Sequence, residues 1–196
     1  MSAHQSQRRV LLQTAAGLAA SHLASTSSAA TPTSGAASSS PRQWHGKPGE
    51  FDFLSGEWKI KHRRIDQPGS KVWSEFEGEA TCWSILGGIG SIEELRIPAR
   101  NFSGMGLRLL DVKNQQWADF WVNAKQGVLT PPPVIGGFEN GVGLFLSDEV
   151  EDGKAFKVRG MWDKISARAC RWQQAVSHDG GATWQDNWIM DWQRVK

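Results

Sequence analysis

The stretch FDFLSGEWKIKHRR, residues 51–64, decides the fold of this chain. Its second half alternates between a face of charged residues only and a face that is mixed. The mixed face carries an aromatic, an aliphatic and two basic side chains: Trp58, Ile60, His62 and Arg64. A period of two is the pattern of a strand with one buried face. We therefore expect a strand that sends a histidine and an arginine toward the protein interior.

Strand-like segments recur after this stretch, separated by turn signals. They cover residues 72–83, 89–98, 105–111, 117–123, 142–150, 154–162, 168–177 and 183–194. The intervening segment 127–138 contains three prolines in a row, which cannot donate to a strand ladder, so we expect a sheet edge or a loop crossing there. Short hairpin turns between neighbours predict an all-β fold. A single antiparallel up-and-down barrel of about nine or ten strands is favoured over a sandwich, because closure removes the edges.

Composition supports a β-rich domain and excludes some partners. The 196 residues include 11 Trp and 8 Phe but no Tyr, and large aromatic side chains favour strands. The formal charge of +2 includes Arg8, Arg9 and Arg42, so the remainder has a slight acidic excess. We expect no nucleic-acid partner, because that needs clustered Lys and Arg.

The N-terminus has the layout of an export signal. Arg8 and Arg9 are followed by an apolar run and then by the small residues Ser28-Ala29-Ala30, as in twin-arginine signal peptides. The alternative is a disordered tail. We assign residues 1–30 to the signal, 31–49 to a disordered Ser/Ala/Pro-rich linker and 50–196 to the barrel domain. The export signal predicts a periplasmic or secreted protein. Its apolar run is too short and too polar for a permanent anchor, so we expect no membrane span in the mature form.

Candidate binding residues are polar or aromatic side chains placed by alternation on inward strand faces. They are His62, Arg64, Glu94, Arg108, Trp121, Asn123, Trp172 and Trp188. Together they indicate a lined pocket, in which tryptophans form the wall and basic groups orient a carboxylate or carbonyl. The alternative is that the charges face outward or pair within a core. A buried Arg needs a partner, so we expect Arg64 or Arg108 to contact Glu94 or Asp119.

Other chemistry has little support in the sequence. There is no Cys-x-x-Cys, no paired histidine and no carboxylate cluster at ligand spacing, so no metal site is predicted. A Gly-x-Ser-x-Gly elbow is absent, and no catalytic residue is assigned. Cys82 and Cys170 could form a disulfide after export or stay as two buried thiols. The Asp-box pattern at residues 177–184 occurs once, which predicts a self-bonded hairpin rather than a propeller.

Several motifs together resemble one family. They are residues 51–58 (FDFLSGEW), 62–64, 86–90, 107–111, 117 with 121–123, 132–143 and 179–188. This set looks like a bacterial domain-of-unknown-function family with a lipocalin-like barrel, which implies a fold but no activity. The Gly-x-Trp also resembles the first-strand motif of lipocalins, in which an Arg of the last strand stacks on the Trp at the closed end. Here that pair would be Trp58 and Arg194.

The leading hypothesis is an exported, non-enzymatic barrel that binds a small molecule. One alternative is a barrel isomerase, cyclase or hydrolase with His62 as general base. Another is a haem-binding barrel, because haem needs only one protein ligand and His62 could supply it. The sequence identifies no cofactor and no oligomeric state.

Overall fold

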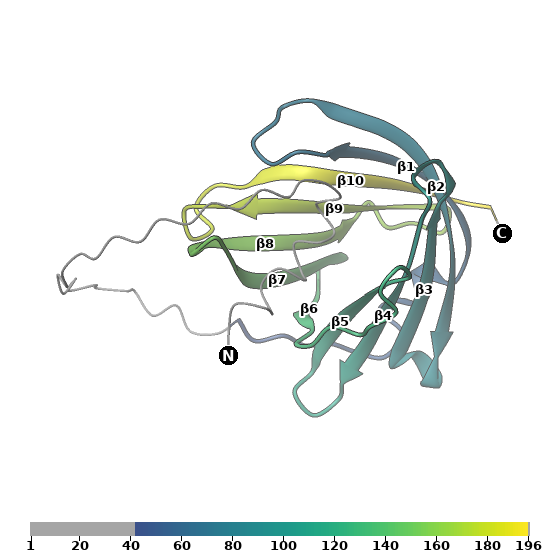
Figure 1. Cartoon of the computed structure of the whole chain (residues 1–196). Helices are drawn as coiled ribbons and strands as arrows, with labels where there is room; N and C mark the ends of the chain where they lie inside the picture. Colours follow the sequence, from purple (N-terminus) through teal and green to yellow (C-terminus); the bar gives the residue numbers. More distant parts are fainter. Residues whose placement is uncertain (1–41, 196) are drawn as a thin grey trace, which may run out of the picture.

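The computed structural model describes residues 42–195 and contains ten strands (Figure 1). They are β1 (Gly56–Ile65), β2 (Trp73–Ile85), β3 (Gly90–Ile97), β4 (Phe102–Asp111), β5 (Gln116–Asn123), β6 (Val134–Glu139), β7 (Val142–Glu151), β8 (Lys154–Asp163), β9 (Ala169–Ser177) and β10 (Gln185–Arg194). Three short 3-10 helices complete it: η1 (Asp52–Leu54) before β1, η2 (Leu86–Gly88) before β3 and η3 (Pro98–Arg100) before β4.

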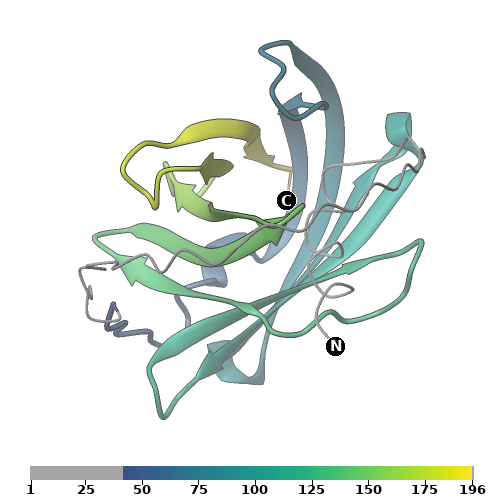
Figure 2. The same cartoon turned by 60° about the vertical axis from the view of Figure 1, so that its left-hand side comes forward.

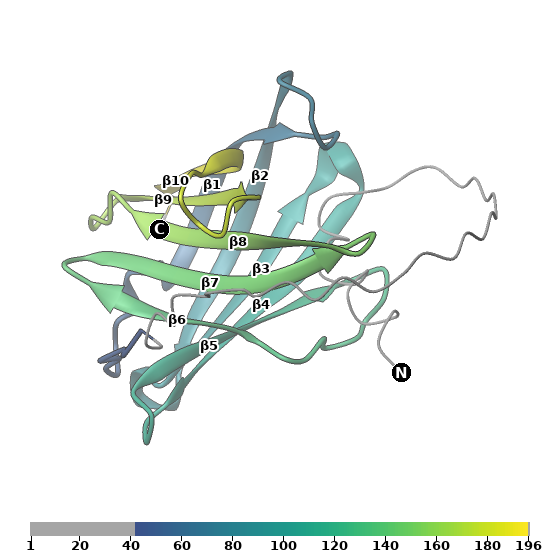
Figure 3. The same ribbon diagram turned by 90° about the vertical axis from the view of Figure 1, so that its left-hand side faces the viewer.

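Each strand pairs antiparallel with its neighbours in sequence, and β10 pairs back with β1 to close a barrel. Figure 2 shows this return, with the yellow β10 near the blue β1. Figure 3 looks across the barrel, with β7 and β8 in front of β3 and β4. The predicted all-β fold, a single up-and-down barrel of antiparallel strands, is confirmed. The architecture is consistent with a lipocalin-like barrel.

One end of the barrel is plugged by the start of the folded chain. Trp58 is 1% exposed, and its indole nitrogen donates to the Leu54 carbonyl at 2.7 Å. The Arg194 guanidinium lies 4.2 Å from the centre of the Trp58 ring and donates to the Phe53 and Ser55 carbonyls. Cation–π stacking of this kind contributes about 0.5–2 kcal/mol. The predicted pairing of Trp58 with Arg194 is confirmed.

The barrel is loosest between β5 and β6. Only three residue pairs join these strands, from Trp117 opposite Gly136 to Asp119 opposite Val134. The residues of β5 beyond Asp119 have no partner on β6, and the chain continues through the three prolines 131–133. Proline cannot donate to a ladder, which explains why pairing stops here. This loosely paired seam becomes one wall of the interior site.

The described part of the expected linker, residues 42–49, lies against the barrel. Trp44 is only 9% exposed, and the amide of Gly46 donates to the Gln115 carbonyl at 2.7 Å. Although the segment is mostly polar, burial of the large Trp44 side chain favours its packing against the barrel. The expected signal peptide, residues 1–30, falls outside the described residues. Among residues 42–195, no helix is both long and apolar enough to cross a membrane.

Two further expectations concern local chemistry. In the Asp-box turn, Asp179 accepts from the Thr183 hydroxyl at 2.6 Å and from the Thr183 amide at 2.9 Å. These bonds hold the pKa of Asp179 well below its ordinary value, as expected for a self-bonded hairpin. Cys82 and Cys170 are both buried free thiols, so the structure has no disulfide between them.

Candidate functional site

The barrel encloses a cavity of about 190 Å³ that reaches the loosely paired β5–β6 seam. Aromatic residues make up much of its wall: Phe120, Trp121, Phe145, Phe156, Trp162, Trp172 and Trp188. The polar lining consists of Glu93, Arg108, Asp119, Asn123, Gln126, Thr130, Ser147, Glu149 and Gln174. A mostly apolar wall with a few polar groups is typical of small-molecule sites.

A buried ion cluster, here called the Arg108 cluster, borders the cavity. It comprises Glu93 on β3, Arg108 on β4 and Asp119 on β5. Arg108 donates a short hydrogen bond to Glu93, and both side chains are at most 5% exposed. The Nε of Arg108 lies 3.7 Å from Asp119 Oδ1, so one guanidinium faces two carboxylates. The Asp119 side chain keeps 25% exposure and is the most accessible charge of the three.

Strand register and a glycine bring this cluster together. Arg108 and Asp119 are direct partners across β4 and β5, whereas Glu93 is the partner of Gly106 on β4. A Cβ at Gly106 would lie 3.1 Å from Arg108 Nη2 and 3.5 Å from Glu93 Cβ. The bare backbone of Gly106 therefore lets the arginine reach back along its own strand to the glutamate.

The surroundings raise the pKa values of both Asp119 and Arg108, for different reasons. Burial raises the pKa of Asp119 to about 6, since the attraction of Arg108 only partly offsets it and Glu93 adds repulsion. Burial disfavours the charged form of Arg108, but Glu93 and Asp119 together raise its pKa above the ordinary value. The arginine stays charged, and the Asp119 carboxyl titrates near pH 6.

The tryptophan wall is set by small residues and ring contacts. Trp121 packs over Gly104, where an added Cβ would lie 2.3 Å from the indole. Trp172 and Trp188 meet edge to face, with ring centres 5.7 Å apart. Gly160 also lines the cavity, and a Cβ there would meet its nearest neighbour at 3.5 Å, an ordinary contact. The wall thus combines rigid rings with unfilled space.

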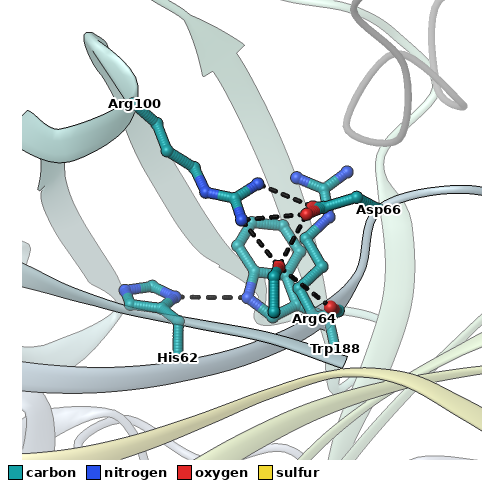
Figure 4. Close-up of polar contacts among 6 residues, drawn as sticks. His62, Arg64, Asp66, Arg100 and Trp188 are labelled. Atoms are coloured by element: carbon teal, nitrogen blue, oxygen red, sulfur yellow. Dashed lines mark hydrogen bonds and ion pairs between the residues drawn. The ribbon is translucent and has the colours of Figure 1, made fainter. Parts of the chain in front are cut away.

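A second polar group lies beside the cavity and shares Trp188 with its lining. This group, here called the His62 cluster, comprises His62, Arg64, Asp66, Ser74, Phe76, Arg100 and Trp188. Figure 4 shows His62, Arg64, Asp66, Arg100 and Trp188. His62 is 1% exposed and stacks on Phe76 with ring centres 4.7 Å apart. Its Nδ1 accepts from the Trp188 indole at 3.2 Å, which places the proton of the neutral ring on Nε2. Nε2 has no hydrogen-bond partner among the described residues, and it faces Gly78, where a Cβ would lie 2.5 Å away.

Arginines cover the outer side of the His62 cluster. The Arg64 guanidinium lies 4.5 Å from the centre of the Trp188 ring, and that of Arg100 lies 3.6 Å from the centre of Phe76. Arg100 also forms a two-pronged ion pair with Asp66, at 2.6 and 3.0 Å (Figure 4). Burial, aided by Arg100 and Arg64, lowers the pKa of His62 to about 3. His62 is therefore neutral at physiological pH.

The structure places the eight predicted binding residues in three different settings. Five line the cavity: Arg108, Trp121, Asn123, Trp172 and Trp188. His62 and Arg64 are not among the residues that line this cavity and lie in the His62 cluster beside it. Glu94 points outward, is paired at 3.0 Å with Arg96, and has a side chain that is 53% exposed. The expected contact of Arg108 with Asp119 is present, but its main partner is Glu93.

Some cavity residues escaped the sequence-based prediction. Glu93 was missed because two glutamates are adjacent and alternation was counted through Glu94. The apolar residues Leu95 and Ile97 are the signal that fixes the inward face, since both are at most 2% exposed. Glu149 lines the cavity from β7, where it shares a face with Phe145, and that alternation was available in the sequence.

The described residues hold neither a metal-ligand cluster nor a cysteine with a lowered pKa. Within residues 42–195, no group of three or more His, Cys, Asp or Glu side chains could hold a metal ion. Burial raises the pKa of Cys170 to about 12 and that of Cys82 further, so neither thiol is a ready nucleophile. What remains is a tryptophan-walled cavity in a closed β-barrel, with one accessible carboxylate. Comparison with protein-family models and with curated proteins finds no match for the chain.

Proposed function

We propose that this protein is an exported small-molecule-binding barrel of the lipocalin-like kind. The observation that carries the proposal is the interior cavity of about 190 Å³ behind the β5–β6 seam. For scale, an apolar protein cavity of roughly 150 Å³ accommodates benzene. The ligand would be a small, largely apolar molecule about as large as one substituted aromatic ring. Export rests on the signal pattern of residues 1–30.

The position of His62 argues for binding rather than catalysis. A general base needs an accessible nitrogen with a pKa near the working pH. His62 has one nitrogen bonded to Trp188 and the other against Gly78, and its pKa is lowered to about 3. An axial haem ligand likewise needs a free nitrogen facing open space. Neither alternative role of His62 draws support from this packing.

Two kinds of experiment test the proposal: detection of a bound small molecule, and a substitution that fills the cavity. Native mass spectrometry of the protein purified from its own host should show a bound small molecule. Tryptophan fluorescence should respond to members of a panel of fatty acids, aromatic acids, aromatic amines and neutral aromatics. Ser147 lines the cavity, so Ser147→Phe should abolish these responses. Its neighbour Asp148 is 82% exposed, so Asp148→Phe should preserve them.

Two results would count against a binding barrel. One is a clean unliganded mass together with no fluorescence response to the whole panel. The other is binding that survives Ser147→Phe unchanged, which would place the ligand somewhere other than this cavity.

A further inference from the structure

Carboxylates outnumber cations around the cavity. Among the described lining residues, carboxylates come from Glu93, Asp119 and Glu149, and Arg108 is the one cationic side chain. Glu93 and Arg108 form the tight pair, with side chains 2% and 5% exposed. The one guanidinium of the Arg108 cluster therefore has a single positive charge to share between two carboxylates.

Asp119 is the carboxylate of this cluster that a ligand can reach. Its side chain is 25% exposed, and Arg108 approaches it only to 3.7 Å, beyond hydrogen-bond distance. The upward shift of its pKa to about 6 has the same origin, because burial and Glu93 disfavour the charge more than Arg108 favours it. A second positive group beside Asp119 would relieve this imbalance.

The surrounding rings favour the same kind of partner. Four tryptophans line the cavity: Trp121, Trp162, Trp172 and Trp188. The face of an aromatic ring is the negative end of its quadrupole, and tryptophan attracts cations most strongly. Aromatic walls combined with a carboxylate are the usual means of recognising organic ammonium groups. An anion in the same space would meet repulsion strengthened by the low local dielectric.

We propose that the cavity selects an organic cation, an amine or quaternary ammonium group on an apolar body the size of one aromatic ring. Asp119 supplies the counter-charge, and the tryptophan wall covers the rest of the molecule. This inference rests on the proposed binding function and adds the charge of the ligand to it.

Three probes of similar size separate charge from shape. Phenyltrimethylammonium carries the cation, tert-butylbenzene is its neutral isostere, and benzoate carries the opposite charge. Isothermal titration calorimetry on the full chain should give phenyltrimethylammonium an affinity at least about tenfold above that of the isostere, with benzoate weakest. Asp119→Asn should reduce the preference for the cation to about threefold or less. Asp148→Asn, on the outer face of β7, should leave it unchanged.

A pH comparison on the unmodified protein guards against misfolding of the Asp119 variant. The charged groups that line the cavity with Asp119 are Glu93 on β3, Arg108 on β4 and Glu149 on β7. Protonation of Asp119 removes its counter-charge, so the preference for the cation should be larger at pH 8 than at pH 5. The affinity of tert-butylbenzene should change little between the two.

The outcomes distinguish the two proposals. Equal affinity for the cation and its isostere, or tightest binding of benzoate, would overturn the choice of a cation and leave the binding barrel standing. Failure of all three probes to bind would overturn this inference, while the host-derived ligand and the wider panel would still decide the proposed function.

Discussion

The Arg108 cluster and the His62 cluster are both polar groups inside one barrel, yet they are packed in opposite ways. The Arg108 cluster borders a cavity and keeps Asp119 one quarter exposed. The His62 cluster is filled by stacked rings, and His62 itself is 1% exposed. Trp188 belongs to both, since it lines the cavity and donates to His62. An inward polar residue therefore does not by itself mark a binding pocket.

Neighbouring residues explain the difference. Beside the cavity, Gly160 leaves room for a methyl group, and the β5–β6 ladder ends at Asp119. Beside His62, the imidazole ring already fills the space that a side chain at residue 78 would occupy. Free space, rather than polarity, distinguishes the two regions.

The largest expected effect comes from breaking the buried ion pair. Glu93→Ala leaves the guanidinium of Arg108 with only a distant partner, and removal of one member of a buried pair costs about 3–5 kcal/mol. Urea unfolding should show this loss or an unfolded protein. Glu94→Ala, one residue along on the outer face, removes an exposed pair and should cost less than about 1 kcal/mol. Similar losses for both variants would mean that Glu93 is not the buried partner.

Lowering the pH should destabilise the fold through His62 and stabilise it through Asp119. Folded His62 has a pKa of about 3, whereas the unfolded ring titrates near 6.5, so the unfolded state binds more protons between these values. Stability from His62 therefore falls as pH drops below about 6.5, by up to about 1.4 kcal/mol per pH unit. Between pH 6.5 and 4.5, wild type should lose about 2–3 kcal/mol more than His62→Gln. Parallel stability curves would show that His62 is not buried in neutral form.

Two glycine substitutions compare filled with unfilled space. Gly78→Ala forces a Cβ to within 2.5 Å of His62 Nε2 and 3.0 Å of the Arg96 carbonyl. Overpacking of this kind costs about 1–3 kcal/mol. Gly160→Ala meets nothing closer than 3.5 Å and should change the free energy of unfolding by less than about 0.5 kcal/mol. Equal costs in thermal or urea unfolding would remove the contrast between the clusters.

The smallest effect concerns Asp119 and has the opposite sign. Its folded pKa of about 6 lies above the ordinary value of 3.8, so its charge destabilises the fold at neutral pH. That cost is present above about pH 6 and disappears as pH falls toward 4. Asp119→Asn should therefore stabilise the protein by about 1–2 kcal/mol at pH 7.5 and have little effect near pH 4. Destabilisation at pH 7.5 would identify Asp119 as a structural partner of Arg108.

The barrel was largely predictable from sequence, because alternation and turn residues are local signals. Residues 51–64 correctly indicate β1, and the three prolines 131–133 mark the loosely paired seam. Trp58 and Arg194 were paired correctly through the resemblance to lipocalins.

The cavity was harder to predict, because the sequence does not show how much space inward side chains leave. His62 and Arg64 alternate inward like the cavity residues, yet stacking fills their surroundings. In β3 the choice between Glu93 and Glu94 depends on a one-residue register that two adjacent glutamates obscure. The expectation that Arg108 orients the carboxylate of a ligand also left out Glu93, whose carboxylate already pairs with that guanidinium.

A crystal structure of the protein under xenon pressure tests the contrast between the clusters most directly, because xenon enters apolar cavities. We predict xenon inside the barrel between Trp121, Trp162 and Trp172, and none in contact with His62. A barrel without xenon, or xenon beside His62 instead, would contradict it.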